Sequence, residues 1–537
     1  MIHFNSDTPT TPEALSAPPA RDVDESDSEL LHSGAEGRGP RRIHLPPARP
    51  LLFIVVLLSL FFTATAWAIS SPTASSPDDD YHLGSIWCPR PATDSCQTRI
   101  GEKGAEVLVP KEIAPESLCY QFHSDVSAAC SLHADDSALS YSGRYDDGGY
   151  PWGYYQFHHL LITHDVDRSV LLMRVVNIAV SVLLLGAIAH AMPGRYRRPF
   201  VLAIIASWIP MGLFFLASNN PSSWALTGVL AWGAALFSAL RTTGAQRIRL
   251  LALGSIGALL CLASRGDAAF FVFVVALAIV LGVPFTRERL PVLALASAAS
   301  IAGIAVMLST GQSSAVSSFS TVANSPYSFP RRIVLNLLSS LEYVAGFFGR
   351  RWGAGWFDVP FDGPIVLIAL GIFGGLLLVG AGRWRIRKAL SLATIIGAMI
   401  GIPFVVAMQN SWPYVYQYQP RYQLPLLAVM VFVLLAHDER SSRLTGLQEL
   451  LLLGASALAH ALALHTLIYR FSHGLGDPFV DLTMNLDFQV AWWRSIPFSP
   501  MTVWIAASLM YTIALTCVFA LDQKRREREP VGNIDPL

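Results

Sequence analysis

Long apolar segments recur along most of the chain, and they limit its fold more than any other feature. A helix of roughly 20 apolar residues crosses the hydrocarbon core of a bilayer, which is about 30 Å thick. Charged residues make up only 14% of the sequence, against roughly 25% in soluble domains. We therefore predict an all-α polytopic membrane protein with about twelve transmembrane helices. The expected spans are 51–70, 170–192, 199–217, 223–240, 250–264, 268–284, 290–309, 364–381, 389–408, 422–437, 447–468 and 501–520.

Two of these assignments leave alternatives open. The first span ends in Ala66-Trp67-Ala68, which is similar to a signal-peptide cleavage site. We favour a retained helix, because the apolar run is longer than a usual signal core and follows the polar tail 1–49. Spans 250–264 and 268–284 are each short for a membrane crossing, so they form either two short spans or a re-entrant pair.

Lys and Arg collect in every second connector, as expected of cytoplasmic loops. These basic connectors are GRYRR (194–198), RTTGAQRIR (241–249), TRER (286–289), GRWRIRK (382–388), DERSSR (438–443) and DQKRRERE (522–529). The pattern predicts a plasma-membrane protein with both termini in the cytoplasm. The sequence contains no long basic stretch of the kind that binds nucleic acid.

This topology divides the chain into three parts. Residues 1–49 are polar and rich in Pro and Ser, which is typical of a disordered tail, and residues 522–537 form a second cytoplasmic tail. Between them, the membrane domain 50–521 carries two large extracytoplasmic loops, 71–169 and 310–363. In the second loop, residues 333–348 have apolar positions at helical spacing, which predicts a helix along the membrane interface.

Four cysteines, Cys88, Cys96, Cys119 and Cys130, lie in the first of these loops. In a segment that faces an oxidising compartment they predict two disulfides. Zinc ligation is the competing reading, although the C-x7-C and C-x10-C spacings are not those of zinc knuckles. The connectivity of the disulfides stays open.

Three consecutive carboxylates follow the first span, in the sequence PDDDYH (77–82). A carboxylate beside an apolar surface can accept a proton from a sugar or lipid hydroxyl, and adjacent carboxylates suit a divalent cation. The alternative is a solvated turn or the cap of a following helix. We take Asp78, Asp79 and His82 as candidate catalytic residues.

Several arginines and aromatic residues are candidates for substrate binding. Arg174 lies just inside a span and should face protein or water. Arg265 either pairs with Asp267 or binds a lipid phosphate. Arg421, followed by Tyr422, lies at the outer end of a span and either binds an anion or reaches the headgroups.

Loop 71–169 ends in a segment rich in aromatic residues and histidines. Trp152 and Tyr155 suit either sugar stacking or interfacial anchoring. His158 and His164 do not have the spacing of metal ligands on one helical face, so they give only a weak indication of a metal site. Arg350 and Arg351 offer a second basic site in loop 310–363.

Six motifs occur in a fixed order along this topology. They are PDDDYH (77–82), YPWGYY (150–155), LLMRVVN (171–177), NNPSSWALTGVLAW (219–232), GWFDVP (355–360) and PRYQLPLL (420–427). Together they resemble a family of bacterial multi-pass membrane proteins of unknown function, DUF2142, which is related to C-type (GT-C) glycosyltransferases. The resemblance covers roughly residues 50–520.

The resemblance implies a GT-C-like fold and a set of site residues. Asp78 would be the catalytic base, Asp79 stands where the family has Glu, and His82 matches the motif histidine. Asp80 falls on a variable position of the motif and would be a solvated charge. Arg421 matches the arginine of the late motif, in which Pro420 replaces a glycine. The shorter Asp79 and the missing glycine are departures from the family pattern.

The function expected from this resemblance is transfer of a sugar from a polyprenyl-phosphate donor at the outer face of the membrane. The partners would be the lipid bilayer, that donor, and a glycan or lipid acceptor of the cell envelope. The cofactor stays open, a divalent cation (Mg or Mn) being one candidate. The alternatives are a transporter or flippase of lipid-linked sugars, or a non-catalytic envelope assembly protein.

Overall fold

The structure is a computed structural model that describes residues 48–90, 96–102, 104–133, 138–311, 326–437, 444–475, 484–494 and 496–526. Almost all of the predicted tails, 1–49 and 522–537, lies outside the described residues, as does the basic connector 438–443.

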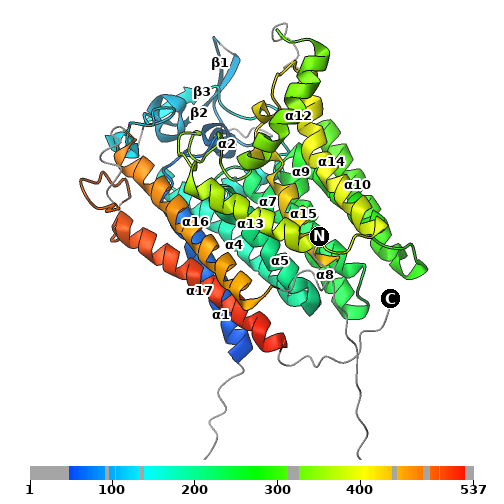
Figure 1. Cartoon of the computed structure of the whole chain (residues 1–537). Helices are drawn as coiled ribbons and strands as arrows, with labels where there is room; N and C mark the ends of the chain where they lie inside the picture. The colour runs from blue at the N-terminus through cyan, green and yellow to red at the C-terminus, as the bar shows by residue number, and fades with distance from the viewer. Residues whose placement is uncertain are drawn as a thin grey trace, which may run out of the picture. The chain divides into compact units, whose positions relative to one another are not determined.

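Every apolar segment predicted to span the membrane forms a helix, and the segment 199–217 is interrupted by a kink at Ile209 (Figure 1). The helices are α1 (Ala48–Ile69), α4 (Val166–Ala191), α5 (Gly194–Ser207) with its short continuation α6 (Leu213–Leu216), α7 (Ser222–Ala239), α8 (Gly244–Ser264), α9 (Gly266–Leu281), α10 (Leu290–Ser309), α13 (Pro364–Gly380), α14 (Ile386–Gln409), α15 (Leu424–Ala436), α16 (Gly446–His473) and α17 (Pro500–Arg526). Within the described ranges, nine are long and apolar enough to cross a membrane, while α9, α13 and α15 are shorter. Nine candidate spans are thus established, and the count of about twelve stays a prediction.

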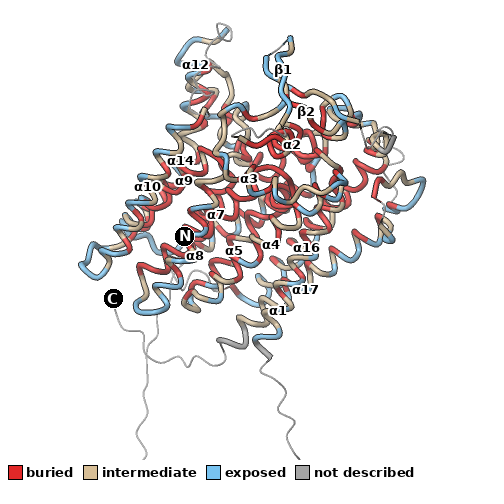
Figure 2. Tube along the Cα trace, turned by 180° about the vertical axis from the view of Figure 1, so that it is seen from behind, coloured by how far each residue is buried: buried red, intermediate tan, exposed pale blue. Residues whose placement is uncertain are grey.

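The centre of the bundle is formed by α7 and α15, in which every residue is buried. Both helices are apolar on all sides, which suits a position surrounded by other helices. Helices α7 and α8 approach closely through small residues: a Cβ on Gly257 would lie 2.9 Å from the carbonyl oxygen of Gly228. Such contacts are typical of helix packing in membranes. Figure 2 shows this buried centre and the more exposed outer helices such as α10.

The basic connectors 241–249 and 286–289 lie together at one end of the bundle, beside the end of α4. Arg247 donates to the carbonyl oxygen of Glu288 at 2.9 Å, and Arg289 donates to that of Leu240 at 3.0 Å. Gln246 donates to the carbonyl oxygen of Ala191 at 2.8 Å. We call this end the basic end. Which side of the membrane it faces stays a prediction.

The opposite end carries the strands and the helices that were not predicted to span the membrane, and we call it the polar end (Figure 1). They are α2 (Asp79–Trp87), α3 (Gly153–His159), α12 (Phe329–Gly346) and the strands β1 (Thr98–Gly101), β2 (Gly104–Pro110) and β3 (Leu139–Ser142). The strands form an antiparallel sheet in the order β1-β2-β3, with Val107 opposite both Thr98 and Ser142. Helix α12 overlaps the predicted amphipathic segment 333–348, so that prediction is confirmed as a helix.

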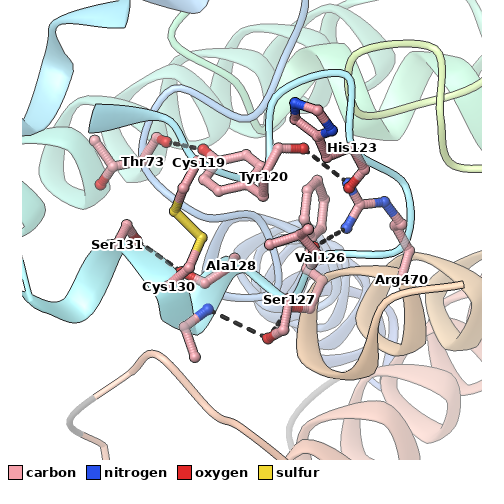
Figure 3. The surroundings of a disulfide bond; sticks show 12 residues. Thr73, Cys119, Tyr120, His123, Val126, Ser127, Ala128, Cys130, Ser131 and Arg470 are labelled. Atoms are coloured by element: carbon pink, nitrogen blue, oxygen red, sulfur yellow. Dashed lines mark hydrogen bonds between the residues drawn. A yellow bond between two sulfur atoms is a disulfide. The ribbon is translucent and has the colours of Figure 1, made fainter. Parts of the chain in front are cut away.

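Two disulfides, as predicted, join Cys88 to Cys96 and Cys119 to Cys130, with Cα–Cα distances of 5.4 and 6.2 Å. The second lies beside Arg470 of α16, whose guanidinium donates to the carbonyl oxygens of Val126 at 2.7 Å and His123 at 2.9 Å (Figure 3). Arg470 also pairs with Asp358 of the loop after α12. One buried arginine thereby ties the first loop and a later loop to the bundle.

Candidate functional site

Asp78 immediately precedes α2, in a left-handed conformation with φ of 65°. Aspartate is one of the few residues other than glycine that visits this conformation. The turn is fixed by the next residue, because the buried carboxylate of Asp79 accepts hydrogen bonds from the backbone N–H and the hydroxyl of Ser76. Asp79 therefore shapes the start of α2, and the side chain of Asp78 stays 38% exposed.

Two arginines from distant parts of the chain bind the carboxylate of Asp78. Arg421, just before α15, donates to Oδ2 at 2.6 Å, and Arg144, just after β3, donates to Oδ1 at 3.2 Å. Partial burial raises the pKa of Asp78, but Arg421 and Arg144 outweigh it and lower this pKa to about 2. Asp78 is therefore ionised at neutral pH, at the edge of the protein surface.

Arg421 itself is buried, with only 3% of its side chain exposed. Its guanidinium donates to the carbonyl oxygen of Pro77 at 3.2 Å and to the hydroxyl of Tyr422 at 3.1 Å. The ring centroids of Phe215 and Tyr422 lie 5.5 and 4.9 Å from its Cζ. Nε of Arg421 is buried and has no hydrogen-bond partner among the described residues. A cation held in this way can bind a further anion.

His82, one turn into α2, is buried beside a group of tyrosines. Its Nδ1 lies 2.9 Å from the hydroxyl of Tyr155, and its ring meets that of Tyr150 edge to face at 5.2 Å. Nε2 is buried without a hydrogen-bond partner among the described residues. Burial lowers the pKa of His82 to about 3, so the ring is neutral at pH 7. Its neutral state suits hydrogen bonding rather than charge pairing.

Arg265 separates α8 from α9 and faces the same tyrosines. Both carboxylate oxygens of Asp267 accept hydrogen bonds from Arg265 at 2.8 Å. Of the two alternatives for Arg265, the pairing with Asp267 is therefore the one present in the structure. The guanidinium nevertheless lies over Tyr422 at 4.8 Å and Tyr150 at 5.8 Å. The tyrosines therefore separate two cations, Arg265 and Arg421, at the polar end.

Arg174 forms a second, fully buried cluster with Asp79, at 3.5 Å. It also donates to the side chain of Asn219 at 2.7 Å and to the carbonyl oxygen of Pro72 at 2.8 Å. Burial raises the pKa of Asp79 to about 6, against the opposing charge of Arg174. This cluster holds the chain between α1 and α2 against α4.

Asp80 is buried, which contradicts the prediction made for it from the sequence. It was expected to be a solvated charge, but its side chain is only 2% exposed. Arg144 donates to both of its oxygens, at 2.9 and 3.1 Å. Because the same guanidinium also reaches Asp78, Asp80 positions Arg144 beside the candidate base.

The structure thus brings together six of the predicted site residues: Asp78, His82, Tyr155, Arg265, Arg421 and Tyr422. Asp79 and Arg174 form the adjacent buried cluster, and Trp152 is 65% exposed at the start of α3. Sequence reasoning missed Arg144 and Tyr150. The three consecutive carboxylates at 78–80 could have indicated a partner such as Arg144, because buried carboxylates require a counter-charge.

A divalent cation was left open by the sequence, and within the described ranges no three His, Cys, Asp or Glu residues lie together in a way that could hold a metal ion. His158 instead bonds to the carbonyl oxygen of Tyr154 and to Asn177, at 2.8 and 2.9 Å. Arg350 and Arg351 are both exposed and pair with Glu342. Metal dependence therefore stays open.

Comparisons with known proteins identify a family. Neither the curated proteins nor the solved structures contain a match to this chain. One family model, described as "Predicted membrane protein (DUF2142)", matches residues 60–430, a range that includes all six residues of the site and more than half of the chain. The match is shorter at both ends than the expected 50–520. The chain therefore belongs to the DUF2142 family of predicted membrane proteins.

Proposed function

We propose that this protein is a membrane glycosyltransferase related to the C type, which takes a sugar from a polyprenyl-phosphate donor at the polar end. The observation that carries the proposal is the contact between Asp78 and Arg421. It places a partly exposed carboxylate against a buried guanidinium, and a second cation, Arg265, lies beyond the shared Tyr422. Sugar transfer from a phosphate donor needs a base for the acceptor and a cation for the leaving group.

In the proposed reaction Asp78 accepts the proton of an acceptor hydroxyl. The acceptor oxygen bonds to the anomeric carbon, and the bond from that carbon to the phosphate oxygen breaks. The departing polyprenyl phosphate keeps the electron pair, and its charge is stabilised by Arg421.

The contact between Asp78 and Arg421 also explains how a weakly basic carboxylate could become a stronger base. With a pKa of about 2 in the resting protein, Asp78 is a poor base. A donor phosphate bound to Arg421 would compete for the guanidinium and bring negative charge close to Asp78. Both effects raise the pKa of a carboxyl group. Donor binding would thus activate the base.

The number of spans and their orientation in the membrane are part of the same proposal. We place α9, α13 and α15 in the membrane as well, which gives twelve spans, and the basic end in the cytoplasm. The polar end with Asp78 then faces outward, where lipid-linked sugars would be available. The two disulfides near that end agree with an oxidising compartment.

Transport of lipid-linked sugars was the competing function. The sequence favours it only at residues 264–267, where Arg265 and Asp267 separate two apolar segments. In a transporter, such charges would be exposed to a central pathway through the membrane. The partly exposed carboxylate of Asp78 and its partner Arg421 instead lie outside the predicted spans, at the polar end. We therefore favour the enzyme.

The test is sugar transfer by Asp78→Asn in membranes supplied with polyprenyl-phosphate sugars. The variant should lose transfer and still insert and fold. Asp362→Asn, which changes an exposed carboxylate between α12 and α13, is the matched control and should retain transfer. Glycan and lipid profiles of a deletion strain would identify the missing sugar. Full transfer by Asp78→Asn would contradict the proposal.

A further inference from the structure

Helix α12 turns its polar side toward the protein and its apolar side away from it. Asn336 and Ser339 are buried against the protein. The large residues on the other side are 53 to 83% exposed and form an apolar stripe along the helix: Val334, Leu337, Leu338 and Leu341. A helix at a water-facing surface has the reverse arrangement, with its apolar side on the protein. The surroundings of the stripe are therefore expected to be apolar.

The polar side of α12 binds the segment 410–423, which joins α14 to α15. The side-chain amide of Asn336 donates to the carbonyl oxygen of Trp412 at 3.0 Å. In the opposite direction, the backbone N–H of Val415 donates to the hydroxyl of Ser339 at 3.1 Å. The two buried polar side chains of α12 thus hold the backbone of this segment.

The last turn of α12 reaches the residue next to Arg421. Gly346 approaches Pro420 so closely that a Cβ on the glycine would clash with the proline ring. Arg421, the next residue, binds Asp78 at 2.6 Å. Helix α12 therefore supports the segment that carries the arginine of the candidate site.

The position of α12 beside α14 indicates that lipid covers the stripe (Figure 1). Helix α14 is a candidate membrane span, and Arg332 of α12 donates to the carbonyl oxygen of Met408 near its end at 3.2 Å. One turn earlier in α14, Val405 is 52% exposed, as expected of a residue that faces lipid. The lipid-facing surface of the span thus reaches the level at which α12 crosses it.

The residues beneath α12 indicate the same depth. The segment 410–423 contains four large aromatic residues in alternate positions: Trp412, Tyr414, Tyr416 and Tyr418. Trp and Tyr are enriched where the hydrocarbon of a membrane meets the headgroups. An amphipathic helix at this level lies along the membrane, with its apolar side about 5–10 Å into the boundary with the acyl chains.

We infer that the apolar stripe of α12 is embedded in the leaflet at the polar end, and that this contact holds the segment of Arg421 against the bundle. An interfacial helix was predicted here from the sequence, but its role in supporting Arg421 was not. The partner is the acyl-chain region of the bilayer rather than a particular headgroup, because the stripe carries no charge. Removing the stripe from water favours this position of α12, and the bound segment keeps its place with the helix.

The first experiment measures what covers the stripe, in the full chain reconstituted in vesicles of phosphatidylcholine and phosphatidylglycerol. Leu338→Cys receives a nitroxide label, with Cys261 and Cys517 replaced by Ser in every protein. Collisions with oxygen report lipid, and collisions with a water-soluble nickel chelate report water. Labels at two exposed positions serve as references: Ile301 of the span α10 for lipid, and Ile100 of β1 for water.

The label at Leu338 should resemble the one at Ile301, with a ratio of oxygen to nickel accessibility several-fold higher than at Ile100. A ratio like that of Ile100 would place the stripe in water and overturn the inference. Low accessibility to both reagents would show that protein, such as a second copy of the chain, covers the stripe, and would also overturn it.

The second experiment measures the support of the Arg421 segment by hydrogen exchange of peptides that cover residues 410–423, in the same vesicles. Leu338→Glu should make these peptides exchange several-fold faster, while the spans keep their protection. Ile100→Glu, at the exposed position in β1, is the matched control and should change nothing. Leu341→Gln replaces Leu338→Glu if that variant does not fold.

Ser339→Ala tests the connection between the two experiments. It removes the acceptor of the Val415 N–H, so the peptides should exchange faster although the label at Leu338 still reports lipid. Unchanged exchange of residues 410–423 in folded Leu338→Glu and Leu341→Gln would overturn the supporting role of α12. Neither measurement depends on sugar transfer, so its outcome is separate from that of the proposed function.

Discussion

Asp78 and Arg421 lie 343 residues apart in the chain, and their side chains meet at 2.6 Å. The contact joins the turn before α2 to the turn before α15, and thus the segments PDDDYH (77–82) and PRYQLPLL (420–427). Neither residue lies in the middle of a span, so the contact is at the polar end, where a lipid headgroup would arrive.

Replacing Arg421 with Gln should impair donor binding and alter the pH dependence of transfer. Arg421 helps to hold the pKa of Asp78 at about 2, and without it burial of the carboxyl group raises this pKa. Transfer requires the ionised base, so the acid limb of kcat/KM should move to higher pH. The measurement is kcat/KM against pH in Arg421→Gln and in wild type. An unchanged acid limb would argue against Asp78 as the base.

The buried pair of Asp79 and Arg174 should matter for stability more than for chemistry. Asp79→Ala leaves Arg174 buried without its counter-charge, which typically costs about 3–5 kcal/mol. Asp147→Asn, at an exposed position of the same loop, should change the free energy of unfolding by less than about 0.5 kcal/mol. Thermal unfolding in detergent measures both. Equal stability of the two variants would mean that the pair does not hold the loop.

The helices were predictable because each depends on a contiguous run of apolar residues. The site was only partly predictable, because its contacts are tertiary. Arg144 meets Asp80 across 64 residues of chain, and Arg470 meets Asp358 across 112. Neither pairing has a periodic signal in the sequence. Asp80 was misjudged for the same reason, since its burial depends on an arginine that no local pattern connects to it.

His82 should remain neutral across the physiological range. Burial lowers its pKa to about 3, below the value of about 6.5 that a histidine has in an unfolded chain. Between these values the unfolded state binds more protons, so the contribution of His82 to stability is complete above pH 6.5 and is lost progressively as the pH falls.

His82→Gln removes this contribution to acid sensitivity. The variant should therefore lose less stability than wild type between pH 6.5 and pH 4, even if it is less stable at pH 7. Other buried histidines, such as His158, are common to both proteins and cancel in the comparison. Denaturant unfolding at several pH values gives the difference. Parallel pH profiles would show that His82 is not buried in its neutral form.

The disulfide between Cys119 and Cys130 should stabilise the first loop beside Arg470. A bridge that closes a loop of this size contributes about 3 kcal/mol in the chain-entropy model. The double variant Cys119→Ser and Cys130→Ser should therefore make the loop around residues 119–133 more sensitive to protease, while the spans remain folded. Limited proteolysis with peptide mapping measures this.

Cys261→Ser, which changes a buried cysteine of α8 outside both bridges, is the control and should leave the cleavage pattern of the loop unchanged. Identical cleavage in all three proteins would show that Arg470 and its carbonyl contacts suffice to hold the loop.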